Sequence, residues 1–370
     1  MINTERLIKL FSDLVSIDSP TLRERQAAEY VKSKLQELGA EYCEDDAGTQ
    51  IGGECGNIFA RISGHNSDKE PILLCTHLDT VEPSKSKRAI VHSDGKITST
   101  GNTVLGADDF SGVAAILEVL TELKENNEDH RPVELVFSVA EESYCTGIRY
   151  FDFSKCKSKI GFVLDLTGAV GTVAVSAPTI LSFEITLHGK AAHAGFTPEL
   201  GINTVTAGAN AISKLQQGKL DSTTTLNFGV ITAGKAPNIV ADEFILRGEI
   251  RSAEHQRAID VYKHVCDTFR NEAAAIGAEA EFSHDIPIHA YRVENDSTAL
   301  AMFSSACNQC SLNIQKTDTF GGSDNAALKV NGFDSIVIAN AMFNCHSTDE
   351  YTTVSDMSKT AEIVYHLLKN

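Results

Sequence analysis

Apolar positions in the first part of the chain follow helical and strand spacings in turn. Leu7, Phe11 and Leu14 share one face of a helix that the spacing predicts over residues 4–15. The solid apolar run at 72–75 is typical of a strand buried on both faces, as in a parallel sheet. Similar patterns predict strands at 56–62, 133–139 and 160–165, a helix at 111–124, and a helix that a Thr21–Glu24 capping box begins and Gly39 ends. This alternation of strands and helices predicts an α/β fold with a mostly parallel sheet.

The pattern changes near residue 178, where apolar and polar residues begin to alternate. The alternation at 181–187 predicts a strand with one solvated face. The elements expected next have the βαββαβ order of a ferredoxin-like α+β unit: a helix at 200–215, strands at 225–232 and 243–251, a helix at 254–275 and a strand at 278–284. The α/β pattern then resumes with helices at 297–306 and 356–369 and strands at 312–316 and 335–339. We therefore expect residues 178–291 to form a domain inserted into another that comprises residues 1–177 and 292–370.

Composition narrows the classes of function. The chain has 32 Lys and Arg residues against 50 Asp and Glu residues, so its formal net charge is −18 with His neutral. Such an acidic chain does not suit nucleic acid or an anionic membrane surface, because both need a basic face. No segment approaches the roughly 20 apolar residues of a membrane span, and the first residues carry charge where a signal peptide is apolar. We expect a cytoplasmic protein whose nine cysteines are free thiols.

Residue types that bind metals stand at the ends of predicted strands, where ligands bind in open α/β sheets. His77 and Asp79 follow the run at 72–75 and point the same way, so the carboxylate can orient the ring. Asp108 lies in a Gly-flanked turn that opens the helix at 111–124, a place where Asp also serves as an ordinary helix N-cap. Either segment alone is a weak indication of a metal site.

More acids and a second histidine follow the other strands. Glu141 and Glu142 come after one strand, and Asp165 closes another. His346 stands in the loop between the last strand and the last helix. The plain alternative for each of these acids alone is a solvated loop or a cap. Together, two histidines and several carboxylates are what a two-metal hydrolytic site requires, and ligands without thiolates suit Zn, Co or Mn.

The combination of these segments resembles the M20 family of metallopeptidases, and within it the peptidase T branch of tripeptide aminopeptidases. The likeness covers nearly the whole chain. The matching residues are, in chain order, His77, Asp79, Asp108, Asp109, Glu141, Glu142, Asp165 and His346. The resemblance implies a zinc-exopeptidase-like catalytic domain with an inserted lid and dimerisation domain. It also implies a homodimer that acts on short peptides.

The resemblance assigns the metal ligands residue by residue. His77, Asp108 and Asp165 would hold one divalent ion. Asp108 would bridge to a second ion, which Glu142 and His346 would also hold. Two zinc ions are implied, with cobalt or manganese as alternatives.

The same resemblance assigns the catalytic residues. Asp79 would orient His77. Glu141 would be the general base that takes a proton from water and delivers it to the leaving amine. The peptide bond between Asp108 and Asp109 is typically cis in the family.

Residues outside the metal cluster also match the family's pattern. In the inserted domain, His193 would stabilise the oxyanion, usually in the active site of the other subunit of a dimer. Asn238 and Arg251 would bind the backbone or carboxylate of the substrate, although a surface charge on a strand is the plain alternative for Arg251. Gly322 and Ser323 belong to a Gly-Gly-Ser-Asp loop that would line the substrate pocket.

One position departs from the peptidase T pattern. Phe320 stands just before the glycine pair, where peptidase T has an arginine that is thought to hold the tripeptide's carboxylate. Asp165 is the residue type that tends to accompany aminopeptidases and dipeptidases in the family. We therefore expect a di-zinc peptidase that releases the N-terminal residue from tripeptides. The alternatives are an M20-type amidohydrolase or N-acyl-amino-acid deacylase, and a non-catalytic peptide-binding relative.

Overall fold

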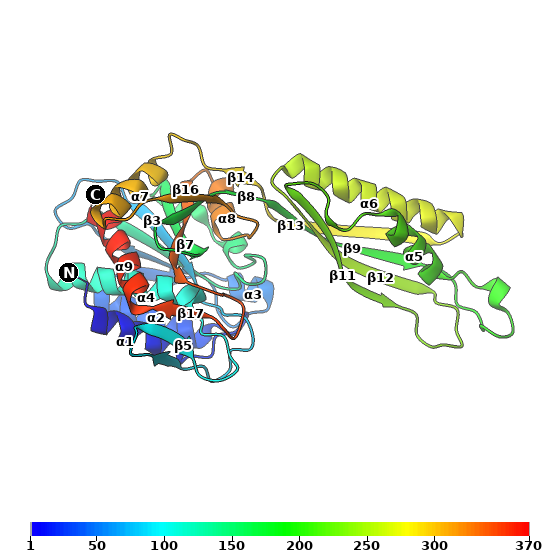
Figure 1. Ribbon diagram of the computed structural model, residues 1–370, viewed down its shortest axis with the longest axis horizontal. Helices are drawn as coiled ribbons and strands as arrows, with labels where there is room; N and C mark the ends of the chain where they lie inside the picture. The colour runs from blue at the N-terminus through cyan, green and yellow to red at the C-terminus, as the bar shows by residue number, and fades with distance from the viewer. Residues whose placement is uncertain (1, 370) are drawn as a thin grey trace. The chain divides into compact units, whose positions relative to one another are not determined.

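The computed structural model describes residues 2–369 and divides the chain into two compact units (Figure 1). The first unit runs to Ser176 and resumes at Arg292, and the second is Ala177–Tyr291. The first unit is a mixed α/β structure with a mostly parallel central sheet, which confirms the predicted fold class. Among the helices of the described residues, none is both long and apolar enough to cross a membrane.

The central sheet of the first unit has four neighbouring parallel strands in its middle. The path through the sheet is β1 (Glu41–Glu44), β2 (Ile58–Ile62), β6 (Val133–Ser138), β3 (Ile72–His77), β7 (Ile160–Thr167), β16 (Asp334–Met342), β8 (Thr172–Ala177) and β14 (Tyr291–Arg292), and β15 (Gln315–Asp318) pairs with β8. The parallel strands are β6, β3, β7 and β16. β3 and β6 are buried along their whole length, so both faces of the sheet are covered there.

Helix α4 (Ala107–Glu125) connects the sheet to the outer helices of the first unit. It packs on β3, β7 and β16, and α1 (Thr4–Val15) and α9 (Val354–Lys369) pack against it in turn (Figure 1). The face of α1 that the spacing predicts is fully buried. The remaining elements of this unit are α2 (Arg25–Leu38), α3 (Ala47–Ile51), α7 (Thr298–Gln309), α8 (Asn325–Val330), the 3-10 turns Ile148–Tyr150 and Phe153–Lys155, and a small sheet of β4 (Ala89–Val91), β5 (Lys96–Ser99) and β17 (Tyr351–Thr353).

The start of α2 differs from the predicted capping box. Thr21 Oγ1 donates to Asp79 Oδ2 at 2.8 Å and does not cap the helix. Glu24 occupies the N-cap position without a side-chain cap bond. Its carboxylate accepts instead from the backbone N–H groups of Leu22, at 2.8 Å, and Ala140, at 3.0 Å. The prediction was wrong because Thr21 and Glu24 bind Asp79 and Ala140, which only the tertiary fold brings near, in place of each other's backbone.

The second unit is an antiparallel sheet with two helices (Figure 1). Its elements are β9 (Thr179–His188), the 3-10 turn Pro198–Leu200, α5 (Thr204–Lys214), β10 (Gly218–Lys219), β11 (Thr224–Ala233), β12 (Glu243–Ser252), α6 (His255–Ala275) and β13 (Glu279–Ile288). Apart from the two-residue β10, they follow the βαββαβ order of a ferredoxin-like unit. The two helices pack on each other and both contact β9 and β12. Between them lies a separate apolar core that includes Phe183, Leu246 and Phe269.

The chain leaves and re-enters the first unit through neighbouring strands. β8 ends at Ala177, β14 begins at Tyr291, and the two strands lie side by side in the sheet. Val293 N donates to Val175 O at 2.8 Å next to this pair. The second unit therefore departs from and returns to one place at the edge of the sheet.

The backbone of Gly147 lies close to that of Val139, just before the Glu141–Glu142 segment, and this close packing can be tested. A Cβ added to Gly147 would lie 1.9 Å from the carbonyl oxygen of Val139. We expect Gly147→Ala to lower the free energy of unfolding by about 1–3 kcal/mol, the usual cost of overpacking, measured as a lower urea midpoint. The matched control is Gly53→Ala, whose added Cβ meets only ordinary contacts at 3.5 Å and beyond. An unchanged midpoint in Gly147→Ala would contradict this approach of the two backbones.

Candidate metal centre

The candidate metal ligands lie at the carboxyl ends of the four parallel strands. In the order β6, β3, β7 and β16, the strands end in or lead to Glu141–Glu142, His77, Asp165 and His346. The register pairs Cys75 of β3 with Val163 of β7, so two residues farther along His77 lies level with Asp165. Side chains that are far apart in the sequence therefore meet at one edge of the sheet, where ligands bind in α/β folds.

Asp108 lies between the two histidines. Its Oδ1 is 3.0 Å from His77 Nε2, and its Oδ2 is 3.2 Å from His346 Nε2. His346 Nε2 is also 3.0 Å from Glu142 Oε2. His77 and Asp108 are buried, whereas the side chain of His346 is 55% exposed. A carboxylate whose two oxygens face two imidazoles has the geometry of a bridging ligand.

Three overlapping groups of ligand atoms fit the binding of metal ions, and two of them contain His77. Atoms of His77, Asp108 and Glu142 lie within 4.8 Å of one another, and so do atoms of His77, Glu141 and Asp165. Glu142 Oε1 is buried and has no hydrogen-bond partner among the described residues, which leaves this oxygen for a cation. Imidazole and carboxylate ligands together suit Zn, Co or Mn.

The acids of the cluster repel one another because like charges lie close together and burial reduces their screening by water. Burial raises the pKa of Glu141, and the nearby Asp165 raises it further. Burial and repulsion from Asp108 raise the pKa of Asp165 in the same way. The contacts of His346 with Asp108 and Glu142 raise the pKa of its imidazole to about 11. Positive charge is therefore favoured at this place, and divalent ions would supply it in place of the protons.

Asp79 contacts both the histidine and the acid pair. Its backbone oxygen lies 3.0 Å from His77 Nδ1, and its Oδ1 lies 3.4 Å from the same nitrogen. Oδ1 also accepts from the N–H of Glu141 at 3.0 Å, and Oδ2 accepts from the N–H of Glu142 at 3.1 Å. The resemblance gives Asp79 the task of orienting His77, and the structure adds contacts that fix the backbone of the acid pair.

Asp109 and Glu350 are buried acids that hold the segment around Asp108 and its neighbours. Neither has a predicted role. The Asp108–Asp109 peptide bond is cis, as the resemblance implies. Asp109 accepts from the N–H of His77 at 3.1 Å and from Asn340 Nδ2 at 2.5 Å. Glu350 accepts from backbone N–H groups just before and at Asp108. No sequence signal marks either acid as buried, beyond the place of Glu350 four residues after His346.

In the second unit, the structure brings His193 and Asn238 together and leaves Arg251 apart from them. Ala194 N, next to His193, donates to Asn238 O at 3.0 Å. Arg251 lies at the other end of β12 from this place. There its Nε and Nη2 contact the carboxylate of Glu249 at 2.6 and 3.1 Å. The two predicted substrate-binding residues of this unit thus do not form one site within it.

The Gly-Gly-Ser-Asp loop of the first unit lies beside the cluster. Ser323 and Asp324 are buried, and Gly322 is exposed. Asp324 Oδ2 accepts a hydrogen bond from Ser138 Oγ at the end of β6. An oxygen of Asp324 also lies within 4.8 Å of one of Glu141. The loop is therefore close enough to line a substrate bound at the cluster.

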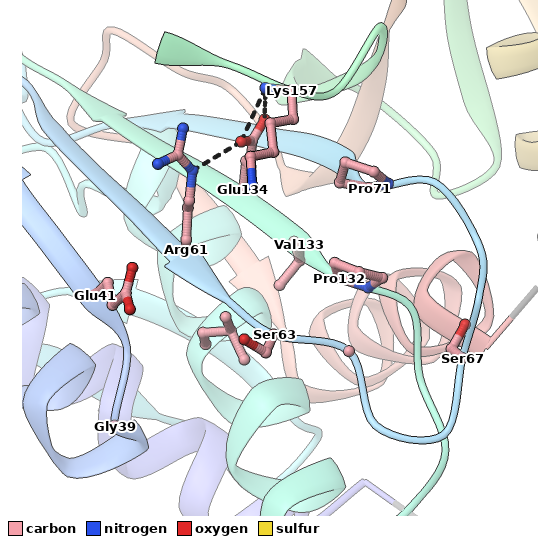
Figure 2. Close-up of a pocket in the computed structure, with 12 residues that line it drawn as sticks. Gly39, Glu41, Arg61, Ser63, Ser67, Pro71, Pro132, Val133, Glu134 and Lys157 are labelled. Atoms are coloured by element: carbon pink, nitrogen blue, oxygen red, sulfur yellow. Dashed lines mark hydrogen bonds and ion pairs between the residues drawn. The ribbon is translucent and has the colours of Figure 1, made fainter.

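A separate hollow of about 770 Å³ lies in the first unit (Figure 2). Its lining includes Pro71 and Val133 at the starts of β3 and β6, whereas the candidate metal ligands lie at the other ends of these strands. As Figure 2 shows, Glu134 in this hollow accepts from Arg61 Nε and Lys157 N, each at 3.0 Å. None of the described residues that line it is a histidine or a cysteine. We therefore place the candidate site at the cluster and not in this hollow.

Comparison with known proteins identifies one family. The sequence model described as Peptidase family M20/M25/M40 matches residues 73–370. The uncharacterized protein YqjE of Bacillus subtilis is 31% identical over 369 residues, which cover 100% of this chain and 99% of that protein. The crystal structure of a tripeptidase from Staphylococcus aureus is similar with a TM-score of 0.93 and 32% identity, over 100% of this chain and 98% of that one. The crystal structure of aminopeptidase PepT from Bacillus cereus has a TM-score of 0.89 and 31% identity, and the match covers 99% of this chain and 98% of that one. The chain is a hydrolase that belongs to peptidase family M20/M25/M40, and it resembles the peptidase T members of that family.

Proposed function

We propose that the protein is a di-zinc aminopeptidase that releases the N-terminal residue from tripeptides. The observation that carries the proposal is the position of Asp108, whose two oxygens face His77 and His346. The substrate class is supported by the relatives from Staphylococcus aureus and Bacillus cereus, which are named a tripeptidase and an aminopeptidase.

Five side chains form the ligand set of this proposal. His77, Asp108 and Asp165 would hold one ion. Asp108, Glu142 and His346 would hold the other. A pair of divalent ions supplies Lewis acidity for the attacking water and the scissile carbonyl. Zinc suits these ligands, and cobalt or manganese would also fit.

Glu141 is the general base of the proposal. Its backbone N–H is held by Asp79 at 3.0 Å, and its Oε1 accepts from Cys145 Sγ at 3.1 Å. Burial and the neighbouring Asp165 raise the pKa of Glu141, and a raised pKa is typical of carboxylates that act as general bases. Glu141 would take a proton from the attacking water and return it to the leaving amine.

His193 is suited to donate a hydrogen bond to the oxyanion. Its Nδ1 accepts from the N–H groups of Gly195 at 3.1 Å and Phe196 at 3.2 Å. Nδ1 is therefore the unprotonated nitrogen, and the neutral ring carries its proton on Nε2. The side chain is exposed. In the proposal it serves the active site of the other subunit of a dimer.

A homodimer through the second unit is also part of the proposal. Within Ala177–Tyr291, β12 pairs along one edge of β11, and β10 covers the other edge only at Thr225 and Leu226. Val230 and Ile231 lie farther along and are 52% and 50% exposed. An edge strand with exposed apolar side chains offers a surface for pairing with a second copy.

The proposed location is the cytoplasm. All nine cysteines are free. Free thiols are the normal state in a reducing compartment. The location therefore agrees with the cysteine chemistry of the chain.

The substrate is tested with a panel of tripeptides, dipeptides and N-acetyl amino acids. We expect release of the N-terminal residue from tripeptides, loss of turnover with a chelator, and recovery when Zn²⁺ or Mn²⁺ is added back. Amino acids released over time are the measurement. Cleavage of N-acetyl amino acids alone would replace the aminopeptidase with a deacylase. Turnover that survives complete metal removal would contradict the metal-dependent mechanism.

The role of Glu141 is tested with Glu141→Ala. We expect turnover to fall by roughly two to four orders of magnitude, the usual contribution of a general base, with both metal ions still bound. Metal content by mass spectrometry and kcat are the measurements. The control is Glu362→Gln, which changes an exposed acid on α9. Near-normal kcat in Glu141→Ala would remove Glu141 as the base.

The role of His193 is tested with His193→Ala, which should lower kcat by roughly two to three orders of magnitude, the scale for loss of an oxyanion donor, and leave the metal content unchanged. Mixing the inactive Glu141→Ala and His193→Ala proteins should then restore activity. In a mixed dimer, one active site has an intact Glu141 and receives an intact His193 from the other subunit. If subunit exchange is demonstrated and the mixture stays inactive, the shared site is wrong.

A further inference from the structure

Glu350 is a buried acid in the loop that carries His346, and it is not one of the proposed ligands. Its Oε2 accepts from the N–H groups of Leu105 at 2.6 Å and Gly106 at 2.8 Å. Its Oε1 accepts from the N–H of Asp108 at 3.0 Å. The residue is only 2% exposed. One buried carboxyl group thus accepts hydrogen bonds from three backbone donors in and before the segment that carries Asp108.

The segment around Asp108 does not satisfy these donors by itself. Asp108 has φ −82° and ψ 100°, and Asp109 has φ −119° and ψ 23°, so regular helical backbone begins only after them. N–H groups at the start of a helix have no partners within that helix. When they are buried, they need an acceptor from elsewhere in the fold. Glu350 supplies that acceptor from a loop about 240 residues away in sequence.

The loop that carries His346 is closed at its base beside Glu350. The backbones of Phe343 and Tyr351 exchange two hydrogen bonds, at 3.1 and 3.0 Å, and their rings stack with centroids 5.0 Å apart. Glu350 N donates to Ser347 O at 3.2 Å inside the loop. The loop is therefore a closed piece of backbone, and the Glu350 side chain connects it to the Asp108 segment.

We propose that Glu350 is a positioning residue that sets the separation of Asp108 and His346, and with it the site of the ion that these residues would share. The inference rests on the proposed metal site, because it concerns the placement of two of its ligands. The His346 side chain is 55% exposed, so packing around the ring does little to fix it. The link through Glu350 restrains the loop from its buried end.

The variant that tests this inference is Glu350→Gln. Glutamine keeps one acceptor oxygen but places an NH₂ group where the second oxygen accepts, so donors face donors on one side. The matched control is Asp349→Asn, which removes the same charge from the exposed neighbour in the same loop. Should Glu350→Gln fail to fold, Glu350→Asp replaces it, because aspartate keeps the charge and shortens the reach by one methylene.

The first measurement is the affinity for Mn²⁺, titrated into full-length protein stripped of metal. We expect Glu350→Gln to bind one of two ions about 10- to 100-fold more weakly, the usual effect of a residue that orients a metal ligand. Asp349→Asn should bind both ions as the wild type does. In Glu350→Gln, kcat for a tripeptide should fall more than KM rises. Two ions bound to Glu350→Gln with wild-type affinity would overturn the inference.

A second measurement separates this inference from the proposed metal function. Hydrogen–deuterium exchange of the metal-free protein reports directly on the N–H groups that Glu350 holds. We expect faster exchange in peptides that cover residues 105–108 and 343–351 in Glu350→Gln, and wild-type exchange in Asp349→Asn. If the wild type binds no pair of ions, the proposed metal site fails, and this local exchange decides the role of Glu350. Unchanged exchange in both peptides overturns the inference whatever the activity.

Discussion

Repulsion among buried carboxylates is the constraint on which the first unit depends. Asp108 and Glu141 are buried, Glu142 and Asp165 are partly buried, and the four acids meet at one edge of the sheet, where burial reduces the screening of their charges by water. Contacts with Asp108 and Glu142 raise the pKa of the His346 imidazole. The cluster needs positive charge among its members, and protons or metal ions are the two available sources. Repulsion among the acids therefore favours the binding of a cation at this place.

Other acids of the same region bind backbone N–H groups and are not among the candidate ligands. Asp79 holds the N–H groups of Glu141 and Glu142, Asp109 holds that of His77, and Glu350 holds the segment that leads to Asp108. Each of them fixes a length of backbone that carries a candidate ligand. The first unit thus uses acidic side chains in two ways: some carboxylates would bind the ions, and others fix the backbone positions of those ligands.

The scaffold could be predicted from the sequence where the physical signal is local. The buried strand at 72–75 and the apolar face of α1 follow from periodicity alone. The predicted capping box at Thr21 does not form because the Thr21 hydroxyl binds Asp79, which is near only in the folded chain. Short strands such as β1 and β4 could not be predicted, because their residues are largely exposed and lack an apolar pattern. The candidate ligands were recognisable as a set and ambiguous singly, whereas the burial of Glu350 depends on N–H groups that no pattern in its own neighbourhood reveals.

The junction between the two units has a consequence for how such chains arise. Because β8 and β14 are neighbours in the sheet, a short turn could join them and leave the strand order of the first unit intact. All the candidate metal ligands belong to that unit, on strands and loops that the junction does not interrupt. Recombination at this junction could therefore add, remove or exchange the second unit in a single genetic event. Such an exchange would leave the strand order around the candidate ligands as it is.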